Sequence, residues 1–317
     1  MAIAAVTVWL VAAFVPRPVA QAAAAQAGEI RGWVIDRTAP VHALESQIIT
    51  LTIAERGSTT ERHTPSDAEG GFVFADLPIG GIRAFLVGTD YAGVHYESNR
   101  IMLSPDAPTR AVSLRVYDPT PDRTAIRDTL AFAVMEIAPG AIRVSVLQRF
   151  ENPTDRTVVT TAGDPLRFPL PPGAGAVAFL AGWQNPVVAG GSITDAFPVL
   201  PGSAFVSYAY VLEVRRPGLA VPWTFPDGTA SVEILVEDVG PRIGGEAVTR
   251  IGTVTEKGRR YQRWSGGPIP AGGRVAIHLD GLPVLNTVWP GIVAGALAIV
   301  LGGGLAQALR RRRASSQ

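Results

Sequence analysis

Cysteine is absent from all 317 positions of this chain. The protein can therefore form no disulfide, no thiolate metal site and no covalent attachment to a c-type haem, and it has no cysteine nucleophile. A folded part placed in an oxidising compartment must then be stabilised by hydrophobic cores alone. That is feasible for domains well above about 70 residues.

Lysine is nearly absent as well, since Lys257 is the only one among 28 basic residues. A genome rich in G and C accounts for this and for the abundance of Ala, Gly and Pro. Apart from Arg17 and the four arginines near the C-terminus, the chain has 23 basic and 27 acidic residues, a formal charge of −4. A nucleic-acid partner needs a basic face, and no run within residues 28–287 supplies one. We therefore expect no nucleic-acid partner.

Charge is missing from the 22 residues Val288–Leu309, and Arg310–Arg313 follow at once. A helix of that length spans about 33 Å, enough for a hydrocarbon layer of about 30 Å. This predicts a transmembrane helix at 288–309, in contact with the lipid bilayer, and an arginine-rich cytoplasmic tail at 310–317. The positive-inside rule places the residues before 288 outside the cytoplasm. The alternative is a buried helix of a soluble domain.

The N-terminus has the layout of a secretory signal peptide over residues 1–27. Ala2–Val15 is an apolar stretch, and an alanine-rich segment then leads to an A-x-A site that ends at Ala27. No Lys or Arg precedes the apolar stretch, and an uncleaved second anchor is the competing interpretation. The two ends together predict a single-pass protein of the cell membrane whose N-terminal domains lie outside the cytoplasm.

The part between these segments shows the period-two alternation of strands and no helical periodicity. Three inward sets are predicted: Ile142, Val144 and Val146 against Arg143, Ser145 and Arg149; Val232, Ile234 and Val236 against Ser231, Glu233 and Glu237; Val275, Ile277 and Leu279 against Arg274, His278 and Asp280. With 34 glycines and 26 prolines between short runs, the chain is predicted to be all-β.

Two tandem β-sandwich domains with one C-terminal transmembrane helix are the predicted architecture. Two prolines and two aspartates make 118–122 a stiff polar connector, so the domains are predicted at 28–118 and 124–281, with a linker at 119–123. The second domain is one large sandwich or two small ones. We favour one, because no second proline-rich linker divides it.

The strongest local pattern is D-x-x-G-x-F-x-F-x-x-L-P-x-G, which runs from Asp67 to Gly80. It predicts a tight turn with left-handed backbone angles, followed by a strand from which Phe72 and Phe74 point inward. The pattern resembles the carboxypeptidase regulatory-like domain, a transthyretin-like seven-stranded sandwich. The likeness covers residues 28–118, with Gly32–Asp36 in the first strand and Ala111–Val116 in the last.

This resemblance implies a non-catalytic module that serves as a rigid spacer or a binding domain, and some relatives share a fold with carbohydrate-binding domains. Certain adhesin sandwiches crosslink themselves through a Lys and Asn pair. Residues 1–256 contain no lysine, so that chemistry is excluded for this domain.

No pattern of catalytic or metal-binding residues is found. Four scattered histidines, His42, His63, His95 and His278, lack ligand spacing, so we expect no metal and no cofactor. The sequence lacks G-x-S-x-G, H-E-x-x-H and S-x-x-K motifs. Glu237 and Asp238 are strand neighbours and point to opposite faces, so they cannot cooperate. An enzyme whose site is assembled from distant strands stays an open alternative.

Aromatic residues are the remaining candidates for ligand contact. The predicted ligand-facing set is Trp183, Trp223, Tyr261 and Trp264, to which Trp33 can be added, and it would form a sugar-stacking platform if exposed. Core packing is the alternative. Trp264 is flanked by arginines and a glycine and is expected to be the most exposed.

These observations predict a membrane-anchored extracytoplasmic protein of the bacterial cell envelope with a non-catalytic binding or scaffold role. The alternatives are a carbohydrate-binding surface module and an accessory subunit of an envelope assembly complex, such as a respiratory or cytochrome-maturation complex. The partner is therefore an unknown envelope protein or polysaccharide.

Overall fold

The computed structural model describes residues 27–284, which divide after Val116 into two compact units. The predicted membrane helix at 288–309, the tail at 310–317 and all of the predicted signal peptide except Ala27 lie outside these residues. Within 27–284, no helix reaches the length and hydropathy that crossing a bilayer requires. The described chain is all-β apart from a short 3₁₀ turn, η1 (Arg123–Ala125).

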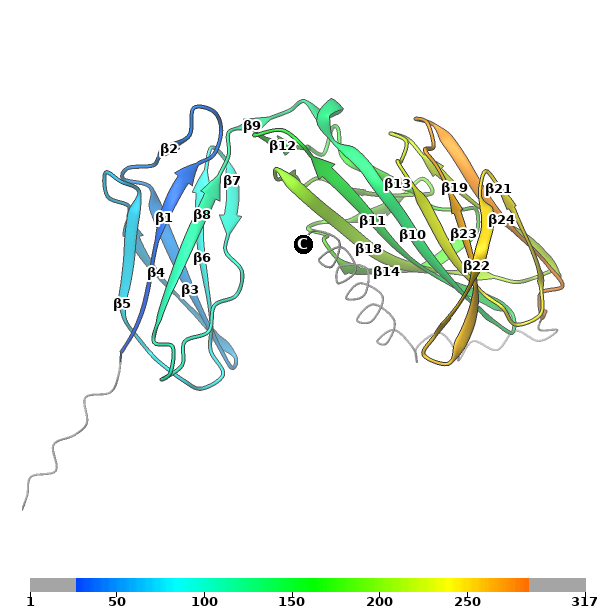
Figure 1. The fold of residues 1–317 in the computed structure, drawn as a ribbon, viewed down its shortest axis with the longest axis horizontal. Helices are drawn as coiled ribbons and strands as arrows, with labels where there is room; N and C mark the ends of the chain where they lie inside the picture. Colours follow the sequence, from blue (N-terminus) through cyan, green and yellow to red (C-terminus); the bar gives the residue numbers. More distant parts are fainter. Residues whose placement is uncertain (1–26, 285–317) are drawn as a thin grey trace, which may run out of the picture. The chain divides into compact units, whose positions relative to one another are not determined.

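The first unit contains two 4-stranded sheets that face each other (Figure 1). Its strands are β1 (Gly28–Asp36), β2 (His42–Ala43), β3 (Ile48–Glu55), β4 (Ser58–Pro65), β5 (Gly71–Leu77), β6 (Ala84–Tyr91), β7 (Val94–Glu97) and β8 (Thr109–Val116). In one sheet β1 pairs antiparallel with β2 and β5 and parallel with β8. The other sheet has the order β4-β3-β6-β7.

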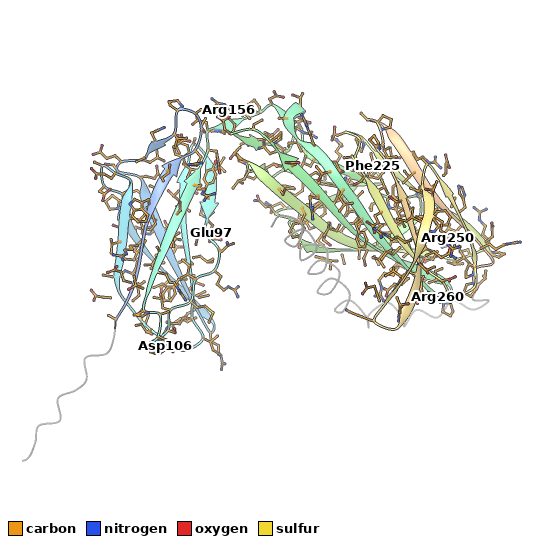
Figure 2. All side chains as sticks on the ribbon, viewed as in Figure 1. Glu97, Asp106, Arg156, Phe225, Arg250 and Arg260 are labelled. Atoms are coloured by element: carbon orange, nitrogen blue, oxygen red, sulfur yellow. The ribbon has the colours of Figure 1, made fainter. Side chains whose placement is uncertain are left out.

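Alternating residues of these strands build the core of the first unit. Phe72 and Phe74 are buried and pack edge to face, with ring centroids 6.1 Å apart. This confirms that both rings point inward. The opposite sheet contributes Leu51 and Val87, which are also buried, so apolar side chains fill the space between the sheets (Figure 2).

The turn before β5 is held by the carboxylate of Asp67. Its Oδ1 accepts hydrogen bonds from the backbone N–H groups of Glu69, at 3.1 Å, and Gly71, at 2.6 Å. Gly70 adopts a φ of +77°, as predicted for a turn with left-handed backbone angles. A side chain there would also collide, because a Cβ would lie 2.5 Å from the carbonyl oxygen of Val34.

The second unit is built around a 7-stranded sheet of order β14-β18-β11-β10-β20-β23-β22. Its strands are β9 (Pro119–Thr120), β10 (Arg127–Ala138), β11 (Ala141–Asn152), β12 (Thr157–Val159), β13 (Leu166–Pro169), β14 (Ala174–Ala181), β15 (Val187–Ala189), β16 (Ser192–Asp195), β17 (Pro198–Val199), β18 (Gly202–Glu213), β19 (Gly218–Phe225), β20 (Val232–Glu237), β21 (Arg242–Glu246), β22 (Thr249–Glu256), β23 (Arg259–Gly266) and β24 (Gly273–Asp280). The other sheets are β13-β16-β15, β19-β24-β21 and β17-β12-β9, each 3-stranded.

The main hydrophobic core of the second unit has buried residues from the 7-stranded sheet and from the sheets that contain β13, β16, β19 and β24, and a smaller cluster of Val134, Leu235 and Tyr261 lies apart from it. The predicted inward sets on β11, β20 and β24 are all buried, which confirms their alternation. The residues predicted as a linker belong to this unit, because Pro119 and Thr120 form β9 and pair with β12. Their backbone is thus part of a sheet.

The two constraints on Gly70 can be separated by comparison with Gly57. Gly57 has a similar φ of +83° but open space around its Cβ position. We expect Gly57→Ala to lower the free energy of unfolding by about 1–2 kcal/mol through backbone strain alone. Gly70→Ala should lower the free energy of unfolding by roughly 1–3 kcal/mol more than that, because its Cβ would also collide with a backbone carbonyl. Urea unfolding followed by circular dichroism measures both, and equal losses would contradict the collision.

Candidate functional site

Three of the four aromatic residues predicted to face a ligand are buried. Trp223 and Trp264 are each 7% exposed and Tyr261 is 4% exposed. The expectation that Trp264 is the most exposed ring is therefore wrong. The reason is Gly245 on β21, where a Cβ would lie 2.8 Å from two carbons of the Trp264 ring. The absent side chain lets the indole pack into the core.

Trp183, the fourth predicted residue, is half-buried at the end of a cluster of rings. Its indole Nε1 donates a 2.7 Å hydrogen bond to the carbonyl oxygen of Ser207. The ring also makes edge-to-face contacts with Phe168, Phe179 and Tyr208, with centroids 5.1, 5.3 and 5.9 Å away. Both its polar and apolar contacts are thus made within the sandwich, so the predicted set does not form one exposed platform.

A cluster of ion pairs lies on the face of the 7-stranded sheet that points away from the main core. Arg259 Nη1 lies 3.2 Å from Oε1 of Glu136 and 3.4 Å from Oε1 of Glu237. Glu237 is only 6% exposed, and its other oxygen accepts a 2.9 Å hydrogen bond from the N–H of Ile137. Burial raises the pKa of the neighbouring Tyr261, and the charges of the two glutamates add to that effect.

Glu237 lies on the face opposite the inward set, and it is buried there because these partners replace water. A buried carboxylate is tolerated only when it is paired and hydrogen-bonded. Asp238, its neighbour in sequence, has different partners, Arg260 at 2.9 Å and Gln262 at 3.2 Å. The two neighbouring carboxylates thus pair with different arginines. The pairing of Glu237 with Glu136 through Arg259 was not predicted, because 101 residues separate the two glutamates in the chain.

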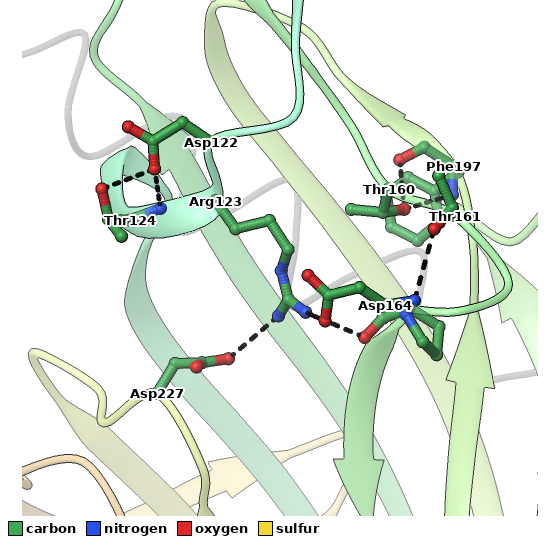
Figure 3. A network of polar contacts seen from close by, with 9 residues as sticks. Asp122, Arg123, Thr124, Thr160, Thr161, Asp164, Phe197 and Asp227 are labelled. Carbon is green, nitrogen blue, oxygen red and sulfur yellow. Dashed lines mark hydrogen bonds and ion pairs between the residues drawn. The ribbon is translucent and has the colours of Figure 1, made fainter.

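Arg123 joins three loops at one end of the second unit (Figure 3). Its Nη1 donates to Oδ1 of Asp164 at 2.6 Å and to the carbonyl oxygen of Pro165 at 3.1 Å, and its Nη2 lies 3.5 Å from Oδ2 of Asp227. Asp122 caps the 3₁₀ turn that carries Arg123, with its carboxylate accepting from the N–H and the hydroxyl of Thr124. Both hydrogen bonds lower the pKa of Asp122, and the one from the Thr124 hydroxyl has the larger effect.

Asp128 is a largely buried carboxyl group near the start of β10. A β-bulge between Asp128 and Leu130 shifts the register of β10 against β11. Desolvation by burial raises the pKa of Asp128 to about 6, although hydrogen bonds from Gln148 and Thr229 oppose the shift. The hydroxyl of Thr229 donates to Oδ1 at 2.9 Å, and the amide of Gln148 donates to Oδ2.

A small cavity opens beside these groups, between the two layers of the sandwich. Its volume is about 20 Å³, and Gln148, Phe168, Tyr208 and Trp223 are among the residues that line it. That is room for one water molecule, because a water needs roughly 10–15 Å³. A sugar ring or a peptide side chain is several times larger. This cavity is therefore too small to be a pocket for either of these ligands.

The histidines in the described range bind separate, local partners. His95 lies 2.8 Å from Asp90, His278 lies 3.6 Å from Glu246, and His63 lies 3.0 Å from the hydroxyl of Thr50. His42 lies 3.0 Å from the carbonyl oxygen of Pro40. Between residues 27 and 284, no three His, Asp or Glu side chains are placed to hold a metal ion.

Among the aromatic residues considered from the sequence, Trp33 on β1 of the first unit is the one that is half exposed to solvent. It is 50% exposed, and the nearby Val73 on β5 is 52% exposed. In the sheet Trp33 stands between Gly71 on β5 and Ser113 on β8. Both of these direct register neighbours have small or no side chains. The alternation of residues 28–36 is a sequence signal that predicts an outward Trp33. Ile30 and Val34 occupy inward positions of the strand, and Trp33 has the opposite parity.

Comparison with protein-family models finds no match, and comparison with curated proteins finds none either. Solved structures that it resembles include an M1 zinc metallopeptidase mutant from Deinococcus radiodurans bound to a Tyr-Ser-Ala substrate, with 13% identity and a TM-score of 0.32. The match covers 59% of this chain and 52% of that chain. The chain thus spans about half the length of that metallopeptidase.

Two further matches are weaker still. A DUF3823 family protein from Parabacteroides merdae has 14% identity and a TM-score of 0.23, over 63% of this chain and 90% of that chain. The major pilin of Corynebacterium diphtheriae has 10% identity and a TM-score of 0.22, over 80% and 84%. Scores this low carry no argument about fold or function, so the reasoning below depends on the geometry alone.

The raised pKa of Asp128 predicts that stability falls as pH rises. With a folded-state pKa of about 6 against an ordinary value of 3.8, the folded chain holds a proton between about pH 4 and pH 6 that the unfolded chain has lost. The free energy of unfolding should therefore decrease across that window. Asp128→Asn should remove this slope and be about 1–3 kcal/mol more stable than the native protein at pH 8.

Tryptophan fluorescence during urea unfolding measures this effect, because Trp183, Trp223 and Trp264 all report on the second unit. Glu151→Gln, which neutralises an exposed carboxylate on β11, is the matched control and should keep the native slope. Parallel stability curves for the native protein and Asp128→Asn would show that Asp128 titrates normally.

Proposed function

We propose that this chain is a single-pass protein of the bacterial cell membrane that holds two β-sandwich units outside the cytoplasm and uses them for binding or as a scaffold, without catalysis. The sequence supports this location. It has an apolar N-terminal stretch with an A-x-A site, and an uncharged run at 288–309 that is followed by four arginines. The two units lie between these segments.

The observation that carries the non-catalytic role is the way in which titratable side chains converge. Arg123 lies between Asp164 and Asp227, and Arg259 lies between Glu136 and Glu237. Each arginine neutralises charges that a general acid or base would need free. In both clusters the pairs join segments far apart in the chain. Both clusters therefore act as structural ion pairs that hold these segments together.

We also propose that the first unit is a carboxypeptidase regulatory-like domain. The support is local: the turn at Asp67–Gly71 forms as the motif predicts, and Phe72 and Phe74 fill the core behind it. In that family the sandwich serves as a spacer or a binding module. The partner is proposed to be an envelope protein or a polysaccharide, and an assembly complex of the envelope fits the same architecture.

Removal of residues 285–317 tests the anchor. The full chain should stay in the membrane pellet after alkaline carbonate extraction, because about 20 apolar residues are enough to span the bilayer. The shortened chain should appear in the soluble fraction outside the cytoplasm. Replacement of Arg310–Arg313 by serines is the matched control, and it should leave membrane retention intact.

Protease added to intact spheroplasts tests the orientation. Fragments from residues 28–281 should disappear while an epitope placed after Gln317 stays protected until the membrane is lysed. If 28–281 resists digestion in intact spheroplasts and is cut only after lysis, the proposed orientation is wrong.

A further inference from the structure

We propose that the outer face of the β1-β5-β8 sheet is a carbohydrate-binding site in which Trp33 stacks on one ring of a neutral polysaccharide. This inference rests on the proposed binding role and names its site and its ligand class. Two features place the site there: an indole that the fold leaves half exposed, and a carboxylate that the adjacent turn places beside it.

Trp33 contributes a large apolar surface that the core does not use. Ile30 and Val34 on the same strand are fully buried, whereas Trp33 points to the other face and is 50% exposed. No hydrogen bond or ring contact within residues 27–284 engages the indole. Sugars present a flat face of C–H groups that packs on such a ring. Gly71 and Ser113, the small neighbours in register, leave it accessible.

Asp67 places a hydrogen-bond acceptor next to the ring. Gly71, the β5 partner of Trp33, has no side chain, and the Asp67 carboxylate occupies that space: a Cβ on Gly71 would lie 2.6 Å from Asp67 Oδ2. Oδ1 already accepts from the N–H groups of Glu69 and Gly71. Oδ2 has no hydrogen-bond partner within the described chain, so it is available to a sugar hydroxyl.

The opposite side of Trp33 offers donors. Ser113 and Arg115 on β8 are exposed, and neither side chain has a hydrogen bond or ion pair inside residues 27–284. Arg31 on β1 is 3.8 Å from Glu29. Among the charged side chains of this face, Glu29 and Asp67 are acidic and Arg31 and Arg115 are basic. A face with balanced charge and both donors and acceptors suits a neutral sugar better than an acidic one.

The size of the patch favours a sugar over a protein. A specific protein interface buries about 800 Å² per partner and engages roughly 20–30 residues. Here the large exposed apolar side chains are Trp33 and Val73. One indole with three or four polar groups around it is enough to hold one or two sugar rings.

Affinity electrophoresis of the full-length chain in a detergent without a sugar head group, such as lauryldimethylamine oxide, tests the proposal. The gels contain mixed-linkage β-glucan, xylan or dextran as neutral probes, and polygalacturonate as an acidic one. We expect at least one neutral polysaccharide to retard the native protein. Trp33→Ala should weaken the retardation about tenfold or more, and Trp33→Phe should retain part of it, because a smaller ring still stacks.

Asp67→Asn should weaken binding severalfold, because it replaces the acceptor beside the ring while an amide oxygen can still accept from the turn.

Phe205→Ala is the matched control. It removes a ring that is 40% exposed on the second unit, and this variant should bind like the native protein. Equal thermal unfolding midpoints for Trp33→Ala and Trp33→Phe show that the loss is one of contact and not of folding. Blue-shifted tryptophan emission on binding, absent in Trp33→Phe, reports the stacked ring directly.

The proposal is overturned if no neutral polysaccharide retards the protein, if Trp33→Ala binds as well as the native chain, or if only polygalacturonate binds. A protein captured from membranes through Trp33, without polysaccharide binding, overturns it too. Any of these results leaves the anchored scaffold standing as long as residues 28–281 are digested from outside the spheroplast. If residues 28–281 are instead protected in intact spheroplasts, the proposed function itself is wrong.

Discussion

Alternate side chains of a strand lie on opposite faces of a sheet, and in this chain the stability of both units depends on that geometry. Without cysteine, no disulfide supplements the burial of apolar side chains. Each unit therefore encloses its apolar residues between two layers. Where an inward position cannot take a side chain, as at Gly245 against Trp264, a missing Cβ makes room for a neighbour's ring.

Local sequence was sufficient to predict what depends on nearest neighbours. The alternation of Ile142, Val144 and Val146 appears in the structure, and so does the turn in front of Phe72. The exposure of Trp264 could not be predicted, because it is set by Gly245 on another strand. The inward position of Asp128 follows from a bulge in the pairing of β10 with β11, and the sequence pattern contains no signal for that extra residue.

In the candidate sites too, local sequence predicts some features, while contacts between distant residues set the others. Glu237 is buried because Arg259 and the N–H of Ile137 replace its water, and Ile137 lies 100 residues away in the chain. Sequence spacing cannot anticipate such contacts. Trp33 is different, because alternation within β1 alone points it outward. Polar clusters of the second unit are thus occupied by structural pairing, whereas the first unit carries an aromatic ring that its own core leaves unused.

The parallel pairing of β1 with β8 has a mechanical consequence. These strands are the first and last of their unit, and they run side by side in one register from Glu29 with Thr109 to Asp36 with Val116. A pull that enters through the start of β1 and leaves through Val116 loads the strands in shear, so all the hydrogen bonds between them share the force. Antiparallel termini would be peeled apart one bond at a time.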